Sequence, residues 1–373
     1  MTFANGESGA SIRAKLNINL IKSRAWADVV ADFGATGDGT TDDTAAIQAA
    51  LDAEPVIRFP KGLFRVTAPL DVSADQTIEG AGKHLSILRL GDNVGSFGAQ
   101  GDAAGTHKGM FTAKYTDNVT IRGLGFDGNR ANGNGNGNGV YAFGSSNLLV
   151  EHCGFKSFTA TTEGEYGNGV RVTRDPAEAI PRNARILFCD ITDVLQSWAV
   201  QISWNVEATD VSHCRVTACR GGIDFSTGNF FRCIGNYVSG VTIAVIGAIN
   251  LQYAYEGTVV GNVLEDNATG IQGHTQRSVI SGNRIKGRGT GSGRGILISP
   301  DSHGFNAITG NQIYNVQAAI ELQSGSGNVI TGNVVSSSGT NSVILAAATS
   351  NNKGTGNYFS GAISDAGTGN TVT

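Results

Sequence analysis

The sequence predicts an all-β protein, a parallel β-helix in which short strands stack coil upon coil. The first observation is a Gly-Asn pair between two short apolar segments, which recurs through the second half of the chain. Its asparagines are 26, 21, 28, 22 and 24 residues apart, and a period of this length is typical of a solenoid. These asparagines, expected to stack in a buried ladder, are Asn236, Asn262, Asn283, Asn311, Asn333 and Asn357.

The composition is the second observation. The 373 residues include 53 glycines and only 6 prolines. Glycine supplies the positive φ angles of tight turns, whereas proline interrupts the hydrogen bonding between strands. A hydrophobic content of 40% is enough for one elongated domain with a long core.

Charge and hydropathy exclude several function classes. A net charge of −4 gives no electrostatic footprint for nucleic acid. No apolar run approaches the roughly 18 residues that a membrane span needs, so membrane insertion is not expected. Residues 1–30 lack the apolar core of a signal peptide. We therefore expect synthesis in the bacterial cytoplasm without a signal peptide.

The asparagine corner can be followed back into earlier coils, where Cys214, Cys189, Cys153 and Leu124 take its place. We expect the three thiols to form a buried stack, since free cysteine is among the most buried residue types. Disulfides and metal sites are not expected, because the sequence has no CxxC pair and neighbouring ladder positions are a coil apart. The sequence does not assign the other two cysteines.

Residues 1–30 differ in composition from the rest and are interpreted as an attachment and oligomerisation segment. Ile12, Leu16 and Leu20 would form a narrow stripe on a short helix, which needs partner helices. The phrase from Asn5 to Asn17 resembles the opening of many tail-associated proteins of bacteriophages and prophages. That resemblance implies attachment to virion or particle proteins; a frayed terminus is the alternative.

The next segment predicts a capped amphipathic helix with Ile47, Ala50 and Leu51 on one face. The string from Ala31 to Leu51, followed by Ile57-Arg58-Phe59-Pro60-Lys61-Gly62, resembles the entry segment of the pectate-lyase-like superfamily, which polygalacturonase-type enzymes and many phage tailspikes share. The resemblance implies a single-stranded right-handed parallel β-helix whose open end is covered by the helix. Residues 31–110 would form this entry, and residues 111–373 the coils.

Each coil carries another strand about 13 residues before the ladder residue, with apolar first and third residues. Because side chains alternate between faces, the second and fourth residues should point to solvent. Stacked coils then produce two outward columns. The first column is Tyr141, Arg171, Gln201, Asp224, Asn250, Gln272, Leu297 and Glu321, and the second is Phe143, Thr173, Ser203, Ser226, Gln252, His274, Ser299 and Gln323.

This polar face suits a chain of hydroxyl groups, and in the superfamily polysaccharide usually lies on this strand face. An ordinary solvated sheet face is the alternative. Arg171 is placed to clamp a uronate carboxylate. The expected sugar-binding residues are Tyr141, Phe143, Arg171, Gln201, Asn250 and Gln272.

Asp224, His274 and Glu321 are the candidate catalytic residues on this face. Asp224 and His274 are two coils apart, about 10 Å. Glu321 is four coils from Asp224, about 19 Å, which exceeds the roughly 6.5–9.5 Å between the paired acids of an inverting hydrolase. A second carboxylate would have to come from a loop, with Glu163 and Glu165 as candidates.

Other motifs are rejected. Arg284-Ile285-Lys286 matches a polygalacturonase motif but follows a ladder asparagine on a different strand, and the other motifs of that family are absent from the coils. No acidic cluster resembles a pectate-lyase calcium site. Neither a metal nor another cofactor is implied.

The sequence therefore favours a spike of a phage, prophage or phage-derived particle, a homotrimer on the particle surface that binds cell-surface polysaccharide. Whether it also depolymerises that polysaccharide stays open, although the face favours a carbohydrate-active protein. One rival is a secreted polysaccharide lyase, epimerase or glycoside hydrolase unrelated to virions. The other is a purely adhesive β-helix without catalysis.

Overall fold

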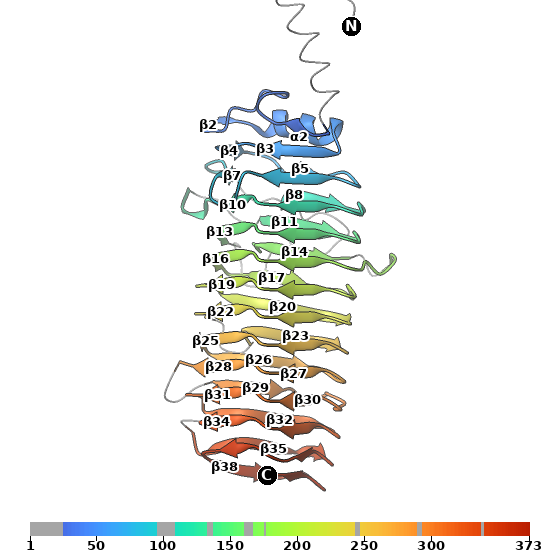
Figure 1. Cartoon of the computed structure of the whole chain (residues 1–373), viewed down its shortest axis with the longest axis vertical. Helices are drawn as coiled ribbons and strands as arrows, with labels where there is room; N and C mark the ends of the chain where they lie inside the picture. Colours follow the sequence, from blue (N-terminus) through green and yellow to red (C-terminus); the bar gives the residue numbers. More distant parts are fainter. Residues whose placement is uncertain are drawn as a thin grey trace, which may run out of the picture.

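The computed structural model describes residues 25–94, 109–132, 137–159, 167–174, 177–242, 247–288, 293–336 and 339–373. In these residues the chain forms a right-handed parallel β-helix of about 12 coils, with one short α-helix at its amino-terminal end (Figure 1). Each coil passes through three parallel sheets, called A, B and C here. The predicted fold class is confirmed.

Sheet A has 14 strands in the described part of the chain. They are β1 (Ala27–Asp28), β3 (Val56–Phe59), β6 (Thr77–Gly80), β9 (Thr120–Arg122), β12 (Leu149–Glu151), β15 (Arg185–Leu187), β18 (Asp210–Ser212), β21 (Arg232–Ile234), β24 (Thr258–Val260), β27 (Val279–Ser281), β30 (Ala307–Thr309), β33 (Val329–Thr331), β36 (Lys353–Gly354) and β39 (Thr371–Val372).

Sheet B follows sheet A in each coil and has 13 strands among the described residues. They are β2 (Asp38–Asp42), β4 (Gly62–Val66), β7 (Ser86–Leu90), β10 (Gly125–Asp127), β13 (Gly154–Thr159), β16 (Asp190–Leu195), β19 (Arg215–Thr217), β22 (Tyr237–Ser239), β25 (Val263–Asn267), β28 (Arg284–Gly287), β31 (Gln312–Tyr314), β34 (Val334–Ser336) and β37 (Tyr358–Phe359). A 3-10 turn, η1 (Arg130–Asn132), follows β10.

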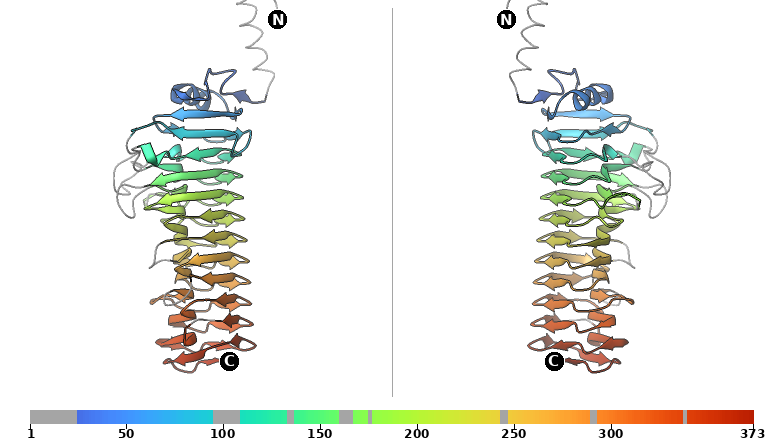
Figure 2. Two further views of the ribbon diagram at one scale, coloured as in Figure 1. Left: turned by 90° about the vertical axis from the view of Figure 1, so that its left-hand side faces the viewer. Right: turned by 90° about the vertical axis from the view of Figure 1, so that its right-hand side faces the viewer.

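Sheet C completes each coil, with 12 strands in the described ranges. They are β5 (Leu70–Asp71), β8 (Gly109–Lys114), β11 (Asn138–Phe143), β14 (Val170–Thr173), β17 (Trp198–Ile202), β20 (Gly221–Asn229), β23 (Ile249–Tyr255), β26 (Thr269–His274), β29 (Arg294–Ile298), β32 (Ala318–Ser326), β35 (Asn341–Ser350) and β38 (Ala362–Asp365). The side views show the coils stacked evenly along one axis (Figure 2).

The core is a set of apolar columns that run along this axis. In sheet A, Val259, Ile280 and Ile308 pair in register and are fully buried. Equivalent positions in successive coils carry β-branched residues because such side chains pack well against the same residue in the strand above. One continuous core therefore fills the solenoid.

The asparagine ladder at the corner between sheets A and B is confirmed. The Asn311 Oδ1 accepts from the backbone N and the Nδ2 of Asn283, at 3.0 and 2.9 Å. Its Nδ2 donates to the carbonyl of Ile280 at 2.9 Å and to the Oδ1 of Asn333 at 3.0 Å. Each amide is thus fully hydrogen-bonded in the dry interior, as buried polar groups must be.

A second asparagine ladder lies at the corner between sheets C and A and was missed in the sequence. Asn306 accepts from Ser278, and Asn306, Asn328 and Asn352 bond to one another in the same pattern. The sequence contained this second pattern, since each of these asparagines stands five positions before an asparagine of the first ladder.

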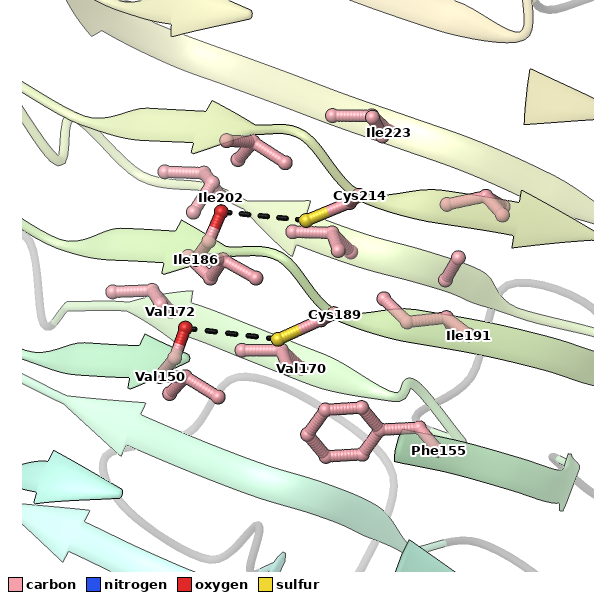
Figure 3. Packing of buried hydrophobic residues seen from close by; sticks show 14 of the residues in the cluster. Val150, Phe155, Val170, Val172, Ile186, Cys189, Ile191, Ile202, Cys214 and Ile223 are labelled. Atoms are coloured by element: carbon pink, nitrogen blue, oxygen red, sulfur yellow. Dashed lines mark hydrogen bonds between the residues drawn. The ribbon is translucent and has the colours of Figure 1, made fainter. Parts of the chain in front are cut away.

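The cysteine stack is also confirmed. The Cys189 and Cys214 thiols donate to the carbonyls of Val150 and Ile186 in the preceding coil, at 3.6 and 3.4 Å (Figure 3). All five cysteines are buried and free. Burial raises the pKa of the Cys219 thiol to about 12, so this thiol stays protonated and inert.

Helix α2 (Thr44–Ala53) covers the first coils, with Ile47, Ala50 and Leu51 buried as predicted. Gln48 extends the cover to the edge of sheet C: its amide accepts from the backbone N of Asp71 at 2.9 Å and donates to that residue's carbonyl at 3.0 Å. An open strand edge invites pairing with other chains, and this amide occupies it. No helix in the described residues is long and apolar enough to cross a membrane.

The cap of this helix differs from the expected one. Asp43 occupies the N-cap position but makes no side-chain hydrogen bond to the helix. Its buried carboxylate instead accepts from the backbone N of Thr36 at 2.6 Å and of Gly37 at 3.1 Å. The Asp43 side chain therefore binds the turn that precedes the helix, and it does not cap the first turn of the helix itself.

We predict that Asn311→Asp lowers the free energy of unfolding by roughly 3–5 kcal/mol at neutral pH. The variant removes the donor to Ile280 and Asn333 and places a carboxylate in the core. Denaturant unfolding measures the change. Asn351→Asp, the same change at an exposed position, should cost under about 0.5 kcal/mol. Equal stability of the two variants would contradict the ladder's structural role.

Candidate functional site

The two sequence-predicted columns lie on sheet C. Successive members of the first column pair in register from Tyr141 through Arg171, Gln201, Asp224, Asn250, Gln272 and Leu297 to Glu321. In the second column, Ser226 pairs with Gln252 and Gln252 with His274. The alternation thus turns these residues away from the core positions between them.

The expectation that these residues face solvent is wrong for most of the first column. Asp224 is 1% exposed and Arg171 2%, and Tyr141, Asn250 and Glu321 are buried as well, as is Phe143 of the second column. The physical reason is that outward side chains only one coil apart fold over one another. Outward side chains on one strand cover one another as well: Tyr141 and Phe143, both on β11, stack with ring centroids 6.2 Å apart and are buried, so neither offers an open ring to a sugar.

Asp224 is the centre of a buried hydrogen-bonded cluster. Its Oδ2 accepts from Ser226 Oγ at 2.7 Å and from Gln201 Nε2 at 3.1 Å. Its Oδ1 accepts from Asn250 Nδ2 at 2.7 Å. Burial raises the pKa of Asp224 above its ordinary value, and the three hydrogen bonds and the charge of Arg171 offset only part of that shift.

Two hydroxyl groups beside this cluster are not satisfied. Thr173 and Ser203 are 1% and 5% exposed, and neither hydroxyl has a hydrogen-bond partner in the described part of the chain. Both belong to the second column, next to Arg171 and Gln201 of the first. Buried polar atoms of this kind are normally matched by water or by a ligand.

The face becomes open one coil beyond Asp224. Tyr253 and His274 stack with ring centroids 4.6 Å apart and planes 13° from parallel. Tyr253 is 40% exposed and His274 and Gln272 are half-buried. The open aromatic surface thus begins one coil beyond the buried carboxyl, and an aromatic face of this kind can hold the apolar side of a sugar ring.

Sequence reasoning missed the exposed aromatic residues. Tyr253 follows Gln252, and Trp204, which is 44% exposed, follows Ser203. Both have positive φ angles, near 55° and 62°, where the strand turns toward the corner. The sequence did contain a sign of them. In both coils an aromatic residue directly follows the residue of the second column, one position after the end of the predicted strand.

Glu321 is separate from this cluster. Leu297 interrupts the polar column between Gln272 and Glu321. The Glu321 carboxylate pairs with Arg294 and accepts from Gln323 Nε2 at 2.7 Å. An arginine on the neighbouring strand thus neutralises this acid, whereas Asp224 is held mainly by neutral donors.

The remaining predictions are placed as follows. Glu163 and Glu165 lie outside the described residues. Arg284 and Lys286 lie on β28 of sheet B, away from sheet C, in agreement with their rejection.

Two family models match the chain. A model described as rhamnogalacturonase A/epimerase, pectate lyase-like, matches residues 26–224, which is more than half of the chain. A second, described as the periplasmic copper-binding protein NosD, matches residues 190–371, slightly under half. No three His, Cys, Asp or Glu side chains within the described ranges group closely enough to hold a metal ion.

Curated relatives fall in two groups. Mannuronan C5-epimerase AlgE5 of Azotobacter vinelandii is 36% identical over 115 residues, covering 28% of this chain and 11% of the epimerase. The pre-neck appendage protein of Bacillus phage phi29 is 27% identical over 124 residues, covering 33% of this chain and 14% of that protein. The chain therefore spans only a small part of the length of these relatives.

Solved structures share the fold over most of the chain. The A-module of mannuronan C-5 epimerase AlgE6 from Azotobacter vinelandii superposes with a TM-score of 0.62 at 17% identity, covering 89% of this chain and 99% of the module. An N-terminal fragment of gene product 12 of bacteriophage phi29 gives 0.59 at 16% identity, covering 96% and 74%. The Dettilon tailspike protein gives 0.52 at 16% identity, covering 97% and 71%.

These comparisons agree with the coil architecture and with the entry segment that the sequence indicated. The first family model begins in the first coil and extends through Asp224. The chain belongs to the rhamnogalacturonase A/epimerase, pectate lyase-like family.

Proposed function

We propose that this protein is a spike of a phage, prophage or phage-derived particle that binds acidic cell-surface polysaccharide along sheet C. The observation that carries the proposal is the junction on that face between the buried Asp224 cluster and the open Tyr253–His274 stack. Similarity to a phage appendage protein and to a tailspike supports the particle assignment.

Charge and hydrogen bonding define what this face would bind. Gln201 and Gln272 are half-buried, and their amides offer both donors and acceptors on this face, which suits the hydroxyl groups of a sugar chain. Asn250 lies between them and holds the Asp224 carboxylate. Arg171 lies two coils from Asp224 and is 2% exposed, so its charge favours a uronate carboxylate on this face through the field it creates rather than by an open contact. The outer face of Tyr253 offers an apolar surface for a pyranose ring.

Asp224 gives the face a capacity for acid–base chemistry. A carboxyl whose pKa is raised by burial keeps its proton at a higher pH than an ordinary aspartate and is suited to donate it to a leaving oxygen. His274, about 10 Å away by coil spacing, approaches the same sugar from the other end of the face. Depolymerisation would use these two groups.

A uronate-modifying enzyme not associated with a virion is the second candidate. The similarity to the mannuronan epimerases favours it. Epimerisation would need a base and an acid on opposite faces of one sugar, a role that Asp224 and His274 would share. Incubating the protein with acidic capsule and with mannuronan separates the candidates: shorter chains indicate cleavage, and altered sugar configuration without shortening indicates epimerisation.

We predict that Asp224→Asn lowers any activity on a confirmed polysaccharide at least ~100-fold, because it removes the proton donor and keeps the shape. Product release from the purified polysaccharide measures it. Asp266→Asn, the same change at an exposed site on sheet B, serves as the control and should keep full activity. An active Asp224→Asn variant would place the chemistry elsewhere.

The same variant tests the raised pKa. Because the pKa of Asp224 is raised above 3.8 in the folded state, the folded protein holds this proton more tightly than the unfolded chain does. The contribution of Asp224 to the free energy of unfolding therefore falls as pH rises above 3.8, and it levels off above the folded-state pKa. The amide that replaces the carboxyl has no proton to lose. We therefore expect the stability of Asp224→Asn relative to the unsubstituted protein to increase with pH over this window, as measured by denaturant unfolding. A pH-independent difference would contradict the raised pKa.

The open part of the face is tested separately. Tyr253→Ala and His274→Ala should each weaken polysaccharide binding about 10-fold, which corresponds to roughly 1.4 kcal/mol, while the melting temperature stays unchanged because both side chains are partly exposed. Calorimetric titration with an acidic capsule oligosaccharide measures binding. His303→Ala, at an exposed histidine outside this face, is the matched control. If both variants bind the oligosaccharide with unchanged affinity, the Tyr253–His274 surface is not part of the binding site.

Residues 1–30 were expected to attach and trimerise the protein, and we retain this as part of the proposal. Ala27 and Asp28 pair with β3 in the first coil, so a truncation that spares the β-helix ends at residue 24. We predict that the full chain has three times the 38.6 kDa chain mass in light scattering and that the truncated chain is a folded monomer. If the truncated chain is still a trimer, the contacts between subunits lie in the β-helix and not in the N-terminal segment.

A further inference from the structure

A hollow of about 400 Å³ lies outside sheet A, at its corner with sheet C. Its volume falls within the roughly 300–1,000 Å³ of small-molecule sites. Its lining residues are Asn147, Asn183, Arg185, Ala208, Thr209, Asp210, Phe230 and Arg232. None of these belongs to the sheet C face described above.

The hollow exists because an exposed asparagine ladder stops. Asn147 Nδ2 donates to Asn118 Oδ1, and Asn183 Nδ2 donates to Asn147 Oδ1, both at 2.9 Å. The next residue in this corner column is Ala208, at φ 52°, and the one after it is Phe230, at φ 59°. The alanine methyl leaves unfilled the space that another asparagine would occupy.

Charge in the hollow is unbalanced. Arg185, Asp210 and Arg232 are register neighbours in sheet A. Asp210 is engaged by Arg232 at 3.7 Å and by the Ser212 hydroxyl. No ion pair within the described residues uses Arg185. Two guanidinium groups against one carboxylate favour an anion, and a guanidinium binds a carboxylate best through two parallel hydrogen bonds.

Polar and apolar groups flank these charges. Thr209 stands five positions before Cys214, at the inward-facing corner position that Asn306 and Asn328 occupy in later coils, so its hydroxyl is buried and does not open into the hollow. Asn183 uses its Nδ2 in the ladder, while Ala208 offers no amide to its Oδ1. Phe230, 55% exposed, adds an apolar ring. Groups that can recognise a carboxylate, a hydroxyl and a ring face are thus combined within three successive coils.

We propose that this hollow is a second saccharide-binding site, specific for a carboxylate-bearing pyranose. The carboxylate binds Arg185, a sugar hydroxyl donates to Asn183 Oδ1, and the apolar ring face packs on Phe230. The site is independent of Asp224 and would hold a second stretch of an acidic polysaccharide on the side of the solenoid.

Residue-resolved NMR on the full chain tests the proposal, with a mannuronate trisaccharide as the probe. The amide signals of Asn183, Ala208, Thr209 and Phe230 should shift saturably. Mannotriose, which lacks carboxylates, and acetate, which lacks the sugar, should each bind at least tenfold more weakly. Saturation by acetate at the same concentration would mean a general anion site and overturn the saccharide assignment, and no saturable shift would overturn the site.

Two variants sharpen the test. Ala208→Asn should continue the ladder from Asn183 and fill the hollow, so the saccharide should no longer shift the amide signals. The variant should fold well, since asparagine tolerates the positive φ of this position better than alanine does. Arg185→Gln should weaken binding at least tenfold, whereas Arg277→Gln, at an exposed arginine three coils beyond Ala208 in the corner column, should not.

Unchanged binding by Ala208→Asn would refute the proposal. Signals of Gln252 and His274 report sheet C in the same spectra, so failure of one site is distinguishable from failure of the other.

Discussion

The in-register stacking of coils is the constraint on which the rest of the structure depends. Each ladder asparagine bonds to the coil before and the coil after it, so the amides fix both the spacing and the register of neighbouring coils. Once one corner is in register, every strand position recurs along the axis. The core columns, the polar columns of sheet C and the hollow outside sheet A all follow from that repetition.

Repetition also explains how a carboxyl comes to be buried on an outer face. Side chains at equivalent positions are only about 4.8 Å apart along the axis, close enough to hydrogen-bond directly. Gln201 and Asn250 therefore close over Asp224 from the two neighbouring coils. Burial within the stack raises the pKa of Asp224, the hydrogen bonds from these two amides lower it in part, and the net rise makes this residue chemically distinct from the exposed acids of the protein.

The fold was predictable because its requirements repeat. A buried asparagine amide needs a hydrogen-bonding partner in the next coil, so the ladder is visible in the sequence as a periodic asparagine. Within each strand, the alternation of apolar and polar residues shows which residues belong to which column. Exposure was not predictable in the same way. Whether Arg171 or Tyr141 contacts water depends on how neighbouring side chains fold over it, and that information is spread over several coils. The hollow at Ala208 was still less visible, since it arises from a small residue in a corner column with no fixed residue type.

A crystal structure of the protein with a bound oligosaccharide of an acidic cell-surface polysaccharide is the most direct test of the central claim. The account predicts sugar density along sheet C from Gln201 to His274, with one pyranose ring on Tyr253 and a ring oxygen or glycosidic oxygen within hydrogen-bond distance of Asp224. Sugar bound solely between subunits or on loops, with sheet C empty at saturating ligand, would contradict it.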